Sequence, residues 1–313
     1  MALSVDLHWP RAGDWPAPGP TLAGSDASRS DVAAVRVGKL VERPVDLALV
    51  GVPTFSTSLS ATHANETPAA VRAALRFYSE FTDRPLGIAF ADFGDAADPD
   101  GDEDVAAALV ARAASVSRLA VILGGDNAAT VPAALGTWGD RIATAGLVTL
   151  DAHHDLRDGR SNGSPVRRLI EAGLSGKRVV QVGIADFANS ADYAARAADL
   201  GITVIRRGTL LTRPIVDVMN EALEIAASAG GPVHVDLDVD VCDRSVAPAC
   251  PASVPGGIAA HELRAAVRAA GAHPAVESID LVEVDATADA ADGRTVRLVA
   301  LCVLEAAAGL CER

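Results

Sequence analysis

From residue 45 onward the chain alternates between short apolar runs and longer Ala- and Leu-rich segments, and this alternation constrains its fold most strongly. The apolar runs are mostly continuous, which is typical of strands buried on both faces. They span residues 45–53, 87–95, 118–125, 145–155, 178–187, 202–207, 233–240 and 277–285. Segments with helical composition lie between them, for example at 67–78, 103–117, 220–229, 260–270 and 293–309. Eight strands alternating with helices predict a three-layer α/β/α domain with an eight-stranded, mostly parallel sheet.

The first 44 residues differ from the rest because they are rich in Pro, Gly, Ser and Ala. We therefore expect residues 1–44 to form an N-terminal arm and residues 45–313 to form a single domain. The N-terminal sequence does not resemble a secretory signal, and no apolar run reaches the roughly 18–20 residues that span a bilayer. The four cysteines form no CxxC pair, which predicts reduced thiols and a cytoplasmic protein.

The formal net charge of −14 narrows the range of partners. Nucleic-acid binding depends largely on Lys and Arg side chains that neutralise phosphates, so a strongly acidic chain is poorly suited to it. The same charge disfavours an anionic membrane surface. We expect a small-molecule ligand instead, with part of the acidic charge used to bind metal ions.

The fourth predicted strand ends in a cluster of ionisable side chains. Asp151, His153 and Asp155 occupy alternate positions and so lie on one side of an extended backbone. Charged groups at the end of a buried strand lose hydration, and this loss is unfavourable unless another charge compensates theirs. A divalent cation compensates it directly. Asp oxygens together with a His nitrogen suit Mn²⁺ and, less exclusively, Zn²⁺, Ni²⁺ or Fe²⁺.

A second cluster lies on the run at 233–240. His234, Asp236, Asp238 and Asp240 share one face, and the alternate positions are all Val or Leu. Neighbouring carboxylates about 7 Å apart along a strand repel one another strongly in a low-dielectric interior. We therefore expect a cation, or several hydrogen-bond donors, beside this face.

A third strand end carries Gly124, Gly125, Asp126 and Asn127. The glycines allow close approach of the backbone, and Asp126 can cap the helix that follows. Taken alone, this segment fits an ordinary loop and helix cap as well as it fits a ligand site.

In this order along the chain, the sequences GGDN, DAHHD and DLDVDVCD resemble three motifs of the ureohydrolase (arginase–agmatinase–formiminoglutamase) family. The usual forms are GGDH, DAHxD and SxDxDxxDPxxxP. Pro248 matches the distal proline of the third motif, whereas Arg244 replaces its first proline and Asp236 replaces its Ser. Residues 280–284 are similar to a D-x-x-E-V segment of the family, so the resemblance covers nearly the whole chain after residue 45.

This resemblance implies a binuclear Mn²⁺ centre with two ions per chain. Asp151 and Asp238 would bridge both ions. Asp155 would hold the first ion, and His153 and Asp240 would hold the second.

The resemblance also implies metal-assisted hydrolysis of a C–N bond in a linear amidine. The metal centre would activate water, and Asp155 would accept its proton and pass it to the leaving amine. Glu283 would orient the cationic amidine or guanidinium group by charge-assisted hydrogen bonds.

Two asparagines depart from the usual pattern. Asn127 stands at the position of the first ion's His, and because a carboxamide is a weaker ligand we expect a weakened first site. Asp236 and Asp243 place further carboxylates beside the expected ligands, where we expect them to support the site. Asn162 stands where many arginases and agmatinases have a His that is credited with proton transfer, and formiminoglutamase-like members often lack this His.

Charged residues near the second motif favour an acidic substrate. Arg157 and Arg160 follow the DAHHD sequence, and we expect them, with Asn162, Asn189 and Glu283, to bind substrate. Arginines suit carboxylates, so they would attract N-formimino-L-glutamate and repel the dication agmatine. The same arginines are equally compatible with ordinary surface positions.

We therefore expect hydrolysis of N-formimino-L-glutamate to glutamate and formamide. One alternative is an agmatinase or another guanidino-compound hydrolase that releases urea. Another is a metal-poor, non-catalytic family member that acts as a binding or regulatory subunit. The five retained ligand positions favour catalysis. Since family members are commonly trimers or hexamers, the resemblance also implies a homo-oligomer.

Overall fold

The computed structural model describes residues 44–313, so the predicted arm, apart from Pro44, lies outside the described residues. All eight predicted strands are present and form one sheet in the order β2-β1-β3-β8-β7-β4-β5-β6. Every pair of neighbouring strands is parallel. The strands are β1 (Val45–Val52), β2 (Phe90–Asp95), β3 (Ser117–Gly124), β4 (Gly146–Leu150), β5 (Val179–Ile184), β6 (Thr203–Arg206), β7 (Val233–Asp238) and β8 (Val276–Val282). The predicted fold class is confirmed.

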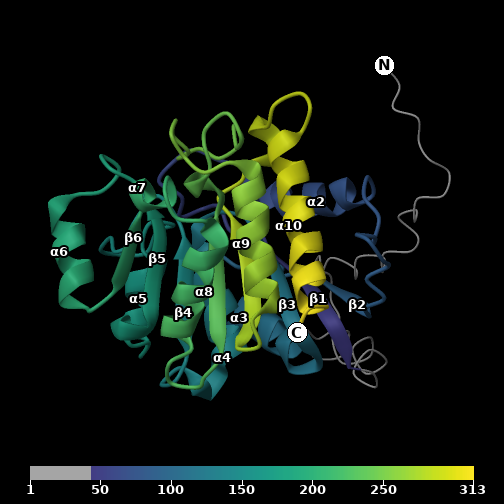
Figure 1. The fold of residues 1–313 in the computed structure, drawn as a ribbon, viewed down its shortest axis with the longest axis horizontal. Coiled ribbons are helices and arrows are strands. Elements are labelled where there is room, and N and C mark those ends of the chain that lie inside the picture. The colour runs from purple at the N-terminus through teal and green to yellow at the C-terminus, as the bar shows by residue number, and fades with distance from the viewer. Residues whose placement is uncertain (1–43) are drawn as a thin grey trace.

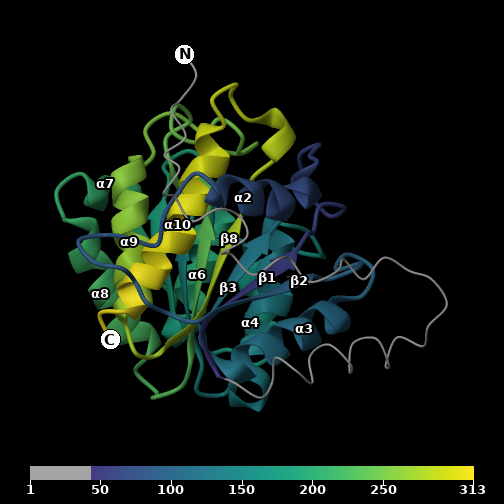
Figure 2. The same cartoon turned by 90° about the vertical axis from the view of Figure 1, so that its right-hand side faces the viewer.

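Helices cover both faces of this sheet. They are α2 (Thr67–Leu75), α3 (Glu103–Val116), α4 (Thr130–Trp138), α5 (Pro165–Glu171), α6 (Ala191–Asp199), α7 (Arg207–Leu210), α8 (Ile215–Ala226), α9 (Ala260–Ala272) and α10 (Arg294–Leu310). One layer contains α2, α8, α9 and α10, and the other contains α3, α4, α5 and α6. Figure 2 shows α8, α9 and α10 on one side of the sheet and α3 and α4 on the other. No helix of the described chain is long and apolar enough to cross a membrane.

The two faces of β7 explain how polar residues come to be buried in this fold. Val233, Val235 and Leu237 pack into the main core beneath α8, α9 and α10. His234 and Asp236 point to the opposite face, where the ring of Trp138 meets that of His234 edge-on with centroids 6.3 Å apart. A strand that is aliphatic on one side and polar on the other therefore lies entirely inside the protein.

The strand order brings distant segments to one edge of the sheet. β3, β8, β7, β4 and β5 are neighbours in this order, and parallel strands all end at the same edge. In Figure 1 the loops that follow β7 and β8 lie above the sheet, at the ends of these strands. Ligands of open parallel sheets bind at this edge.

Candidate metal centre

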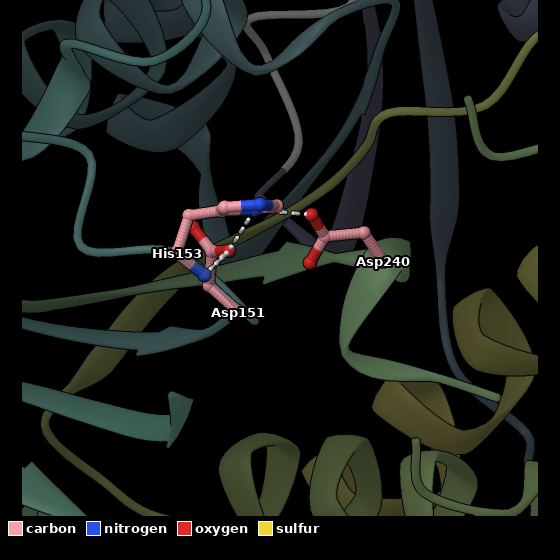
Figure 3. Close-up of side chains that lie close together, drawn as sticks. All are labelled: Asp151, His153 and Asp240. Atoms are coloured by element: carbon pink, nitrogen blue, oxygen red, sulfur yellow. Dashed lines mark hydrogen bonds and ion pairs between the residues drawn. The ribbon is translucent and has the colours of Figure 1, made fainter. Parts of the chain in front are cut away.

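Three side chains from two neighbouring strand ends form a compact group (Figure 3). Asp151 and His153 follow β4, and Asp240 lies in the short helix η5 (Val239–Val241) that follows β7. One donor atom of each residue lies within 4.8 Å of the other two. His153 Nδ1 is 2.6 Å from Asp240 Oδ2 and 3.5 Å from Asp151 Oδ1. Side chains from the DAHHD and DLDVDVCD segments therefore lie close together.

Backbone amides hold these carboxylates in place. Asp151 Oδ1 accepts a hydrogen bond from His153 N at 2.6 Å, and Asp240 Oδ1 accepts one from Ala152 N at 2.9 Å. Asp238 caps η5 by accepting a hydrogen bond from Asp240 N at 2.7 Å. The segment after β4 and the segment after β7 are thus tied to each other through Asp240.

Burial and mutual repulsion shift the acidity of this group. Burial raises the pKa of Asp151 to about 7, and it also raises the pKa values of Asp155 and Asp238 well above the ordinary range. Burial opposes a charge on His153, but its close contacts with the negatively charged carboxylates of Asp151 and Asp240 outweigh burial and raise the His153 pKa to about 11. In the metal-free chain a protonated His153 therefore compensates part of the negative charge.

The donor atoms fit a divalent cation. Asp151 Oδ2 is buried and accepts no hydrogen bond, and Asp240 Oδ2 faces only the His153 ring, without the geometry of a hydrogen bond. Buried carboxylate oxygens without donors are strongly disfavoured unless a cation or proton compensates them. Two carboxylates and one imidazole are also a donor set that suits Mn²⁺.

Asp155 and Asp238 lie outside the compact group but line the same pocket. Asp155 is buried and has a positive φ of 53°, an unusual conformation for a residue other than Gly. Such strain persists where the surrounding structure enforces it, often at functional sites.

Asn127 is engaged by the protein itself. Its Oδ1 accepts a hydrogen bond from Thr130 Oγ1 at 2.6 Å, and its Nδ2 donates one to Asp155 Oδ2. Its backbone N donates to Glu283 Oε1 at 2.8 Å. In this arrangement Asn127 orients Asp155 and Glu283, and its carboxamide oxygen is occupied by Thr130.

Glu283 follows β8 and faces the same pocket. It is buried, has a φ of 61° and is fixed by a hydrogen bond from its N to Gly125 O at 2.8 Å. Burial raises its pKa to about 7. Asn162 Nδ2 donates to Glu283 Oε1 at 2.7 Å, and Asn162 Oδ1 accepts from Leu59 N.

An arginine lines the pocket over these groups. Among the described residues, Arg157 is the only Lys or Arg that lines it. Its guanidinium carbon lies 6.0 Å from the ring centroid of Tyr193, which lines the same pocket from α6. No side-chain hydrogen bond or ion pair joins Arg157 to another described residue.

Comparisons with known proteins agree with this geometry. A sequence model described as the arginase family matches residues 45–309 of the chain. The chain belongs to the arginase family. It is 31% identical to formimidoylglutamase from Bacillus subtilis over 90% of this chain and 91% of that protein. It is 32% identical to formimidoylglutamase from Halobacterium salinarum over 84% and 88%, respectively.

Solved structures support the same family fold. The crystal structure of formimidoylglutamase from Bacillus subtilis superposes with a TM-score of 0.83 at 27% identity, over 98% of this chain and 94% of that chain. Formiminoglutamase from Trypanosoma cruzi, solved with Mn²⁺, superposes with a TM-score of 0.79 at 21% identity, over 97% and 99%. At that identity the second likeness concerns the fold alone. The resemblance recognised in the sequence is confirmed.

Two predicted substrate-binding residues of this arginase-family protein have other contacts. Arg160 does not line the pocket, because its guanidinium lies 3.2 Å from Glu103 and donates to the carbonyl oxygen of Asp100. Asn189 lines the pocket, but its Nδ2 donates to the carbonyl oxygens of Ala152 and Ala185, so its amide group serves the backbone. We therefore leave Arg160 out of the proposed site and treat Asn189 as part of its wall.

The two additional carboxylates differ in their surroundings. Asp236 is fully buried, and neither of its oxygens has a hydrogen-bond partner among residues 44–313. Asp243 lies outside the pocket and accepts hydrogen bonds from Ser245 N and Gly256 N. Asp243 thus stabilises the loop after η5.

Three residues of the arginase-family site carried no signal in the sequence. Tyr193 is an aromatic residue in a helix, Gln181 is a single polar residue in a strand, and Arg207 follows β6. Arg207 donates to the carbonyl oxygens of Asp240 and Val241, and so supports η5. Only the tertiary structure, in which β5 pairs with β4 and β6 pairs with β5, shows that these residues adjoin the site.

Proposed function

We propose that this arginase-family protein is a Mn²⁺-dependent hydrolase that converts N-formimino-L-glutamate to L-glutamate and formamide. The observation that carries this proposal is the charge pattern of the pocket, which combines Asp155, Asp238 and Glu283 with Arg157. A substrate with a cationic amidine and two carboxylates complements this pattern. Relatives named formimidoylglutamase that match most of the chain support the same substrate.

In the proposed centre, Asp155 would help to hold the first Mn²⁺ and His153 and Asp240 would help to hold the second, while Asp151 and Asp238 would supply further carboxylate oxygens. When bound, the metal would supply Lewis-acid activation of water near neutral pH. We propose that the first ion would bind more weakly than the second, because Asn127 provides no imidazole there and its carboxamide oxygen already accepts a hydrogen bond from Thr130.

Glu283 is suited to orient the amidine. Both of its hydrogen bonds, from Asn127 N and Asn162 Nδ2, go to Oε1. Oε2 is therefore left to accept a hydrogen bond from a substrate N–H group, and this charge-assisted contact would fix the plane of the amidine. Asn162 takes no part in proton transfer in this arrangement.

Asp155 and Arg157 act at the two ends of the substrate. Burial raises the pKa of Asp155, so its carboxylate can accept a proton during attack and return it to the leaving amine. Arg157 has no acidic partner in the described chain, so its guanidinium is free to bind a substrate carboxylate. Agmatine carries a cationic amine instead of this carboxylate and would be repelled.

A guanidino acid is the second candidate substrate. The chain is 33% identical to guanidinopropionase from Pseudomonas aeruginosa over 59% of this chain and 61% of that protein. A guanidino acid also joins a cationic head to a carboxylate, so the same Arg157 is compatible with it. Agmatine lacks this feature.

The test is an activity assay on Mn²⁺-loaded protein, in which formamide release from N-formimino-L-glutamate is compared with urea release from 3-guanidinopropionate, arginine and agmatine. The proposal expects formamide release to be fastest by kcat/KM. Faster urea release from a guanidino acid would favour the second candidate, and no turnover of any of these would favour a non-catalytic role. Elemental analysis of the same sample counts the ions per chain.

The remaining parts of the proposal concern assembly and location. We propose a single catalytic domain at 45–313 within a cytoplasmic homo-oligomer, a trimer or hexamer, as the family resemblance implies. Sedimentation equilibrium of the full chain measures the oligomeric state, and a monomer would contradict the assembly.

A further inference from the structure

A row of buried polar side chains crosses the sheet beneath the candidate metal centre. Gln181 on β5 is paired in register with Thr149 on β4, which is paired with Asp236 on β7 and, through it, with Asp280 on β8. All four side chains are fully buried. Polar groups at the centre of a parallel sheet are disfavoured unless they make specific contacts.

Gln181 reaches from this row to the segment that carries the proposed ligands. Its Nε2 donates to the carbonyl oxygen of His154 at 2.8 Å, and its Oε1 lies 2.6 Å from His154 Nδ1. From the other side, Asn189 Oδ1 accepts a hydrogen bond from His154 N at 2.9 Å. Two amide side chains thus bind the backbone N–H, the carbonyl and one ring nitrogen of a single residue.

These contacts determine the state of the His154 ring. The carbonyl oxygen of His154 can only accept, so the Gln181 amide must present its NH₂ group there and its oxygen to the ring. An amide oxygen also only accepts, so His154 Nδ1 must carry the ring proton. In the neutral ring, Nε2 therefore holds the lone pair.

The hydrogen bonds from Gln181 and Asn189 to His154 matter because of where His154 lies in the chain. His154 lies between His153 and Asp155, and Asp155 has the positive φ of 53°. This conformation is uncommon for a residue other than Gly, and it persists where the surrounding structure enforces it. Because the His154 carbonyl is bonded to Asp155 N, fixing this peptide group fixes the start of the strained residue.

We propose that Gln181 is a positioning residue of the metal centre: by clamping His154 it fixes the 151–155 segment in its metal-binding conformation. Gln181 does not line the substrate pocket, and both hydrogen-bonding groups of its side chain contact His154, so it acts through His154. This inference rests on the proposed metal site but not on the identity of the amidine that is hydrolysed.

The first test measures Mn²⁺ binding to the full chain, by electron paramagnetic resonance of free Mn²⁺, for wild type, Gln181→Leu and Thr149→Val. Loss of a residue that supports metal ligands typically weakens binding about 10- to 100-fold, which is the change expected for Gln181→Leu. Thr149→Val is the matched control. It removes a hydroxyl without a hydrogen-bond partner from the same buried row, so it should leave the dissociation constant unchanged.

The second test does not depend on how the variants fold. In ¹⁵N spectra of wild-type protein without Mn²⁺, recorded at a pH where the ring is neutral, His154 should be protonated at Nδ1 and not at Nε2. A proton on Nε2 would overturn the proposal. So would a Gln181→Leu protein that binds Mn²⁺ as tightly as wild type, or equal weakening by Thr149→Val. A wild-type protein that binds no Mn²⁺ would instead refute the proposed metal site itself.

Discussion

Removal of metal from this arginase-family protein should make its stability fall as the pH rises. The reason is that burial raises the pKa values of three carboxyl groups at the ends of β4 and β7, those of Asp151, Asp155 and Asp238. A group whose pKa is higher in the folded state contributes stability that is complete below its unfolded pKa. That stability is lost as the pH rises through the folded pKa.

The pKa shift of Asp151 gives the size of this loss of stability. The ordinary pKa of Asp151 is 3.8, and burial raises it to about 7 in the folded chain. Above pH 5 the unfolded carboxyl is ionised, while the folded one keeps most of its proton until the pH approaches 7. Stability therefore falls by at most about 1.4 kcal/mol per pH unit, and by about 2 kcal/mol between pH 5 and pH 7. His153 acts in the same direction above pH 6.5, because its folded pKa is raised to about 11.

The assay is urea denaturation at pH 5, 6 and 7, with either EDTA or excess Mn²⁺. In EDTA, a loss of about 2 kcal/mol moves the urea midpoint down by about 1 M. Mn²⁺ binds the ionised carboxylates and should reverse this trend, because its affinity increases as protons leave.

The matched control is Asp151→Asn, which removes one titrating carboxyl. Its stability in EDTA should fall less steeply, by about 1.4 kcal/mol less per pH unit. A wild-type protein whose stability in EDTA is constant or increases between pH 5 and pH 7 would refute the reasoning, since the carboxylates would then be ionised without penalty.

Three substitutions test the proposed substrate and metal contacts. Arg157→Met should raise the KM for N-formimino-L-glutamate about 10- to 100-fold with little change in kcat, since a charge-assisted hydrogen bond contributes about 1.5–3 kcal/mol; an unchanged KM in steady-state assays would exclude this contact. Glu283→Gln should lower kcat/KM at least about 10-fold without changing Mn²⁺ stoichiometry, whereas loss of an ion would show that Glu283 serves the metal. Asn127→His should tighten binding of the weaker Mn²⁺ about 10-fold in calorimetric titrations, and weaker binding would mean that the hydrogen bond from Asn127 to Asp155 matters more than an added imidazole.

Most of the sheet and the ligand group could be predicted because the fold makes the inference simple. Continuous apolar runs in alternation with helices indicate parallel strands, and parallel strands end at one edge. Side chains such as Asp151, His153 and Asp240, which follow two of these strands, must therefore meet if the strands are neighbours. The sequence does not state that β4 and β7 are neighbours, but the family motifs implied it.

The paths of the loops could not be predicted in the same way. Arg157 and Arg160 are three residues apart and chemically equivalent, yet only Arg157 faces the pocket, because Glu103 and the backbone of Asp100 bind Arg160. The contacts of Asn127 could not be predicted from the sequence for a similar reason. Its engagement by Thr130 and Asp155 depends on where the chain turns after β3. Loop geometry of this kind follows from tertiary contacts and not from local sequence patterns.

The strand order also determines when the site can form as the chain is synthesised. β8 is the last strand in the sequence, yet it lies in the middle of the sheet between β3 and β7. Until residues 276–282 leave the ribosome, β3 and β7 have unpaired inner edges, which are prone to pair with other chains. The carboxylates after β7 also lack the strand that carries Glu283. Synthesis of nearly the whole chain therefore precedes assembly of the sheet centre, and Glu283 joins the pocket only at this last stage.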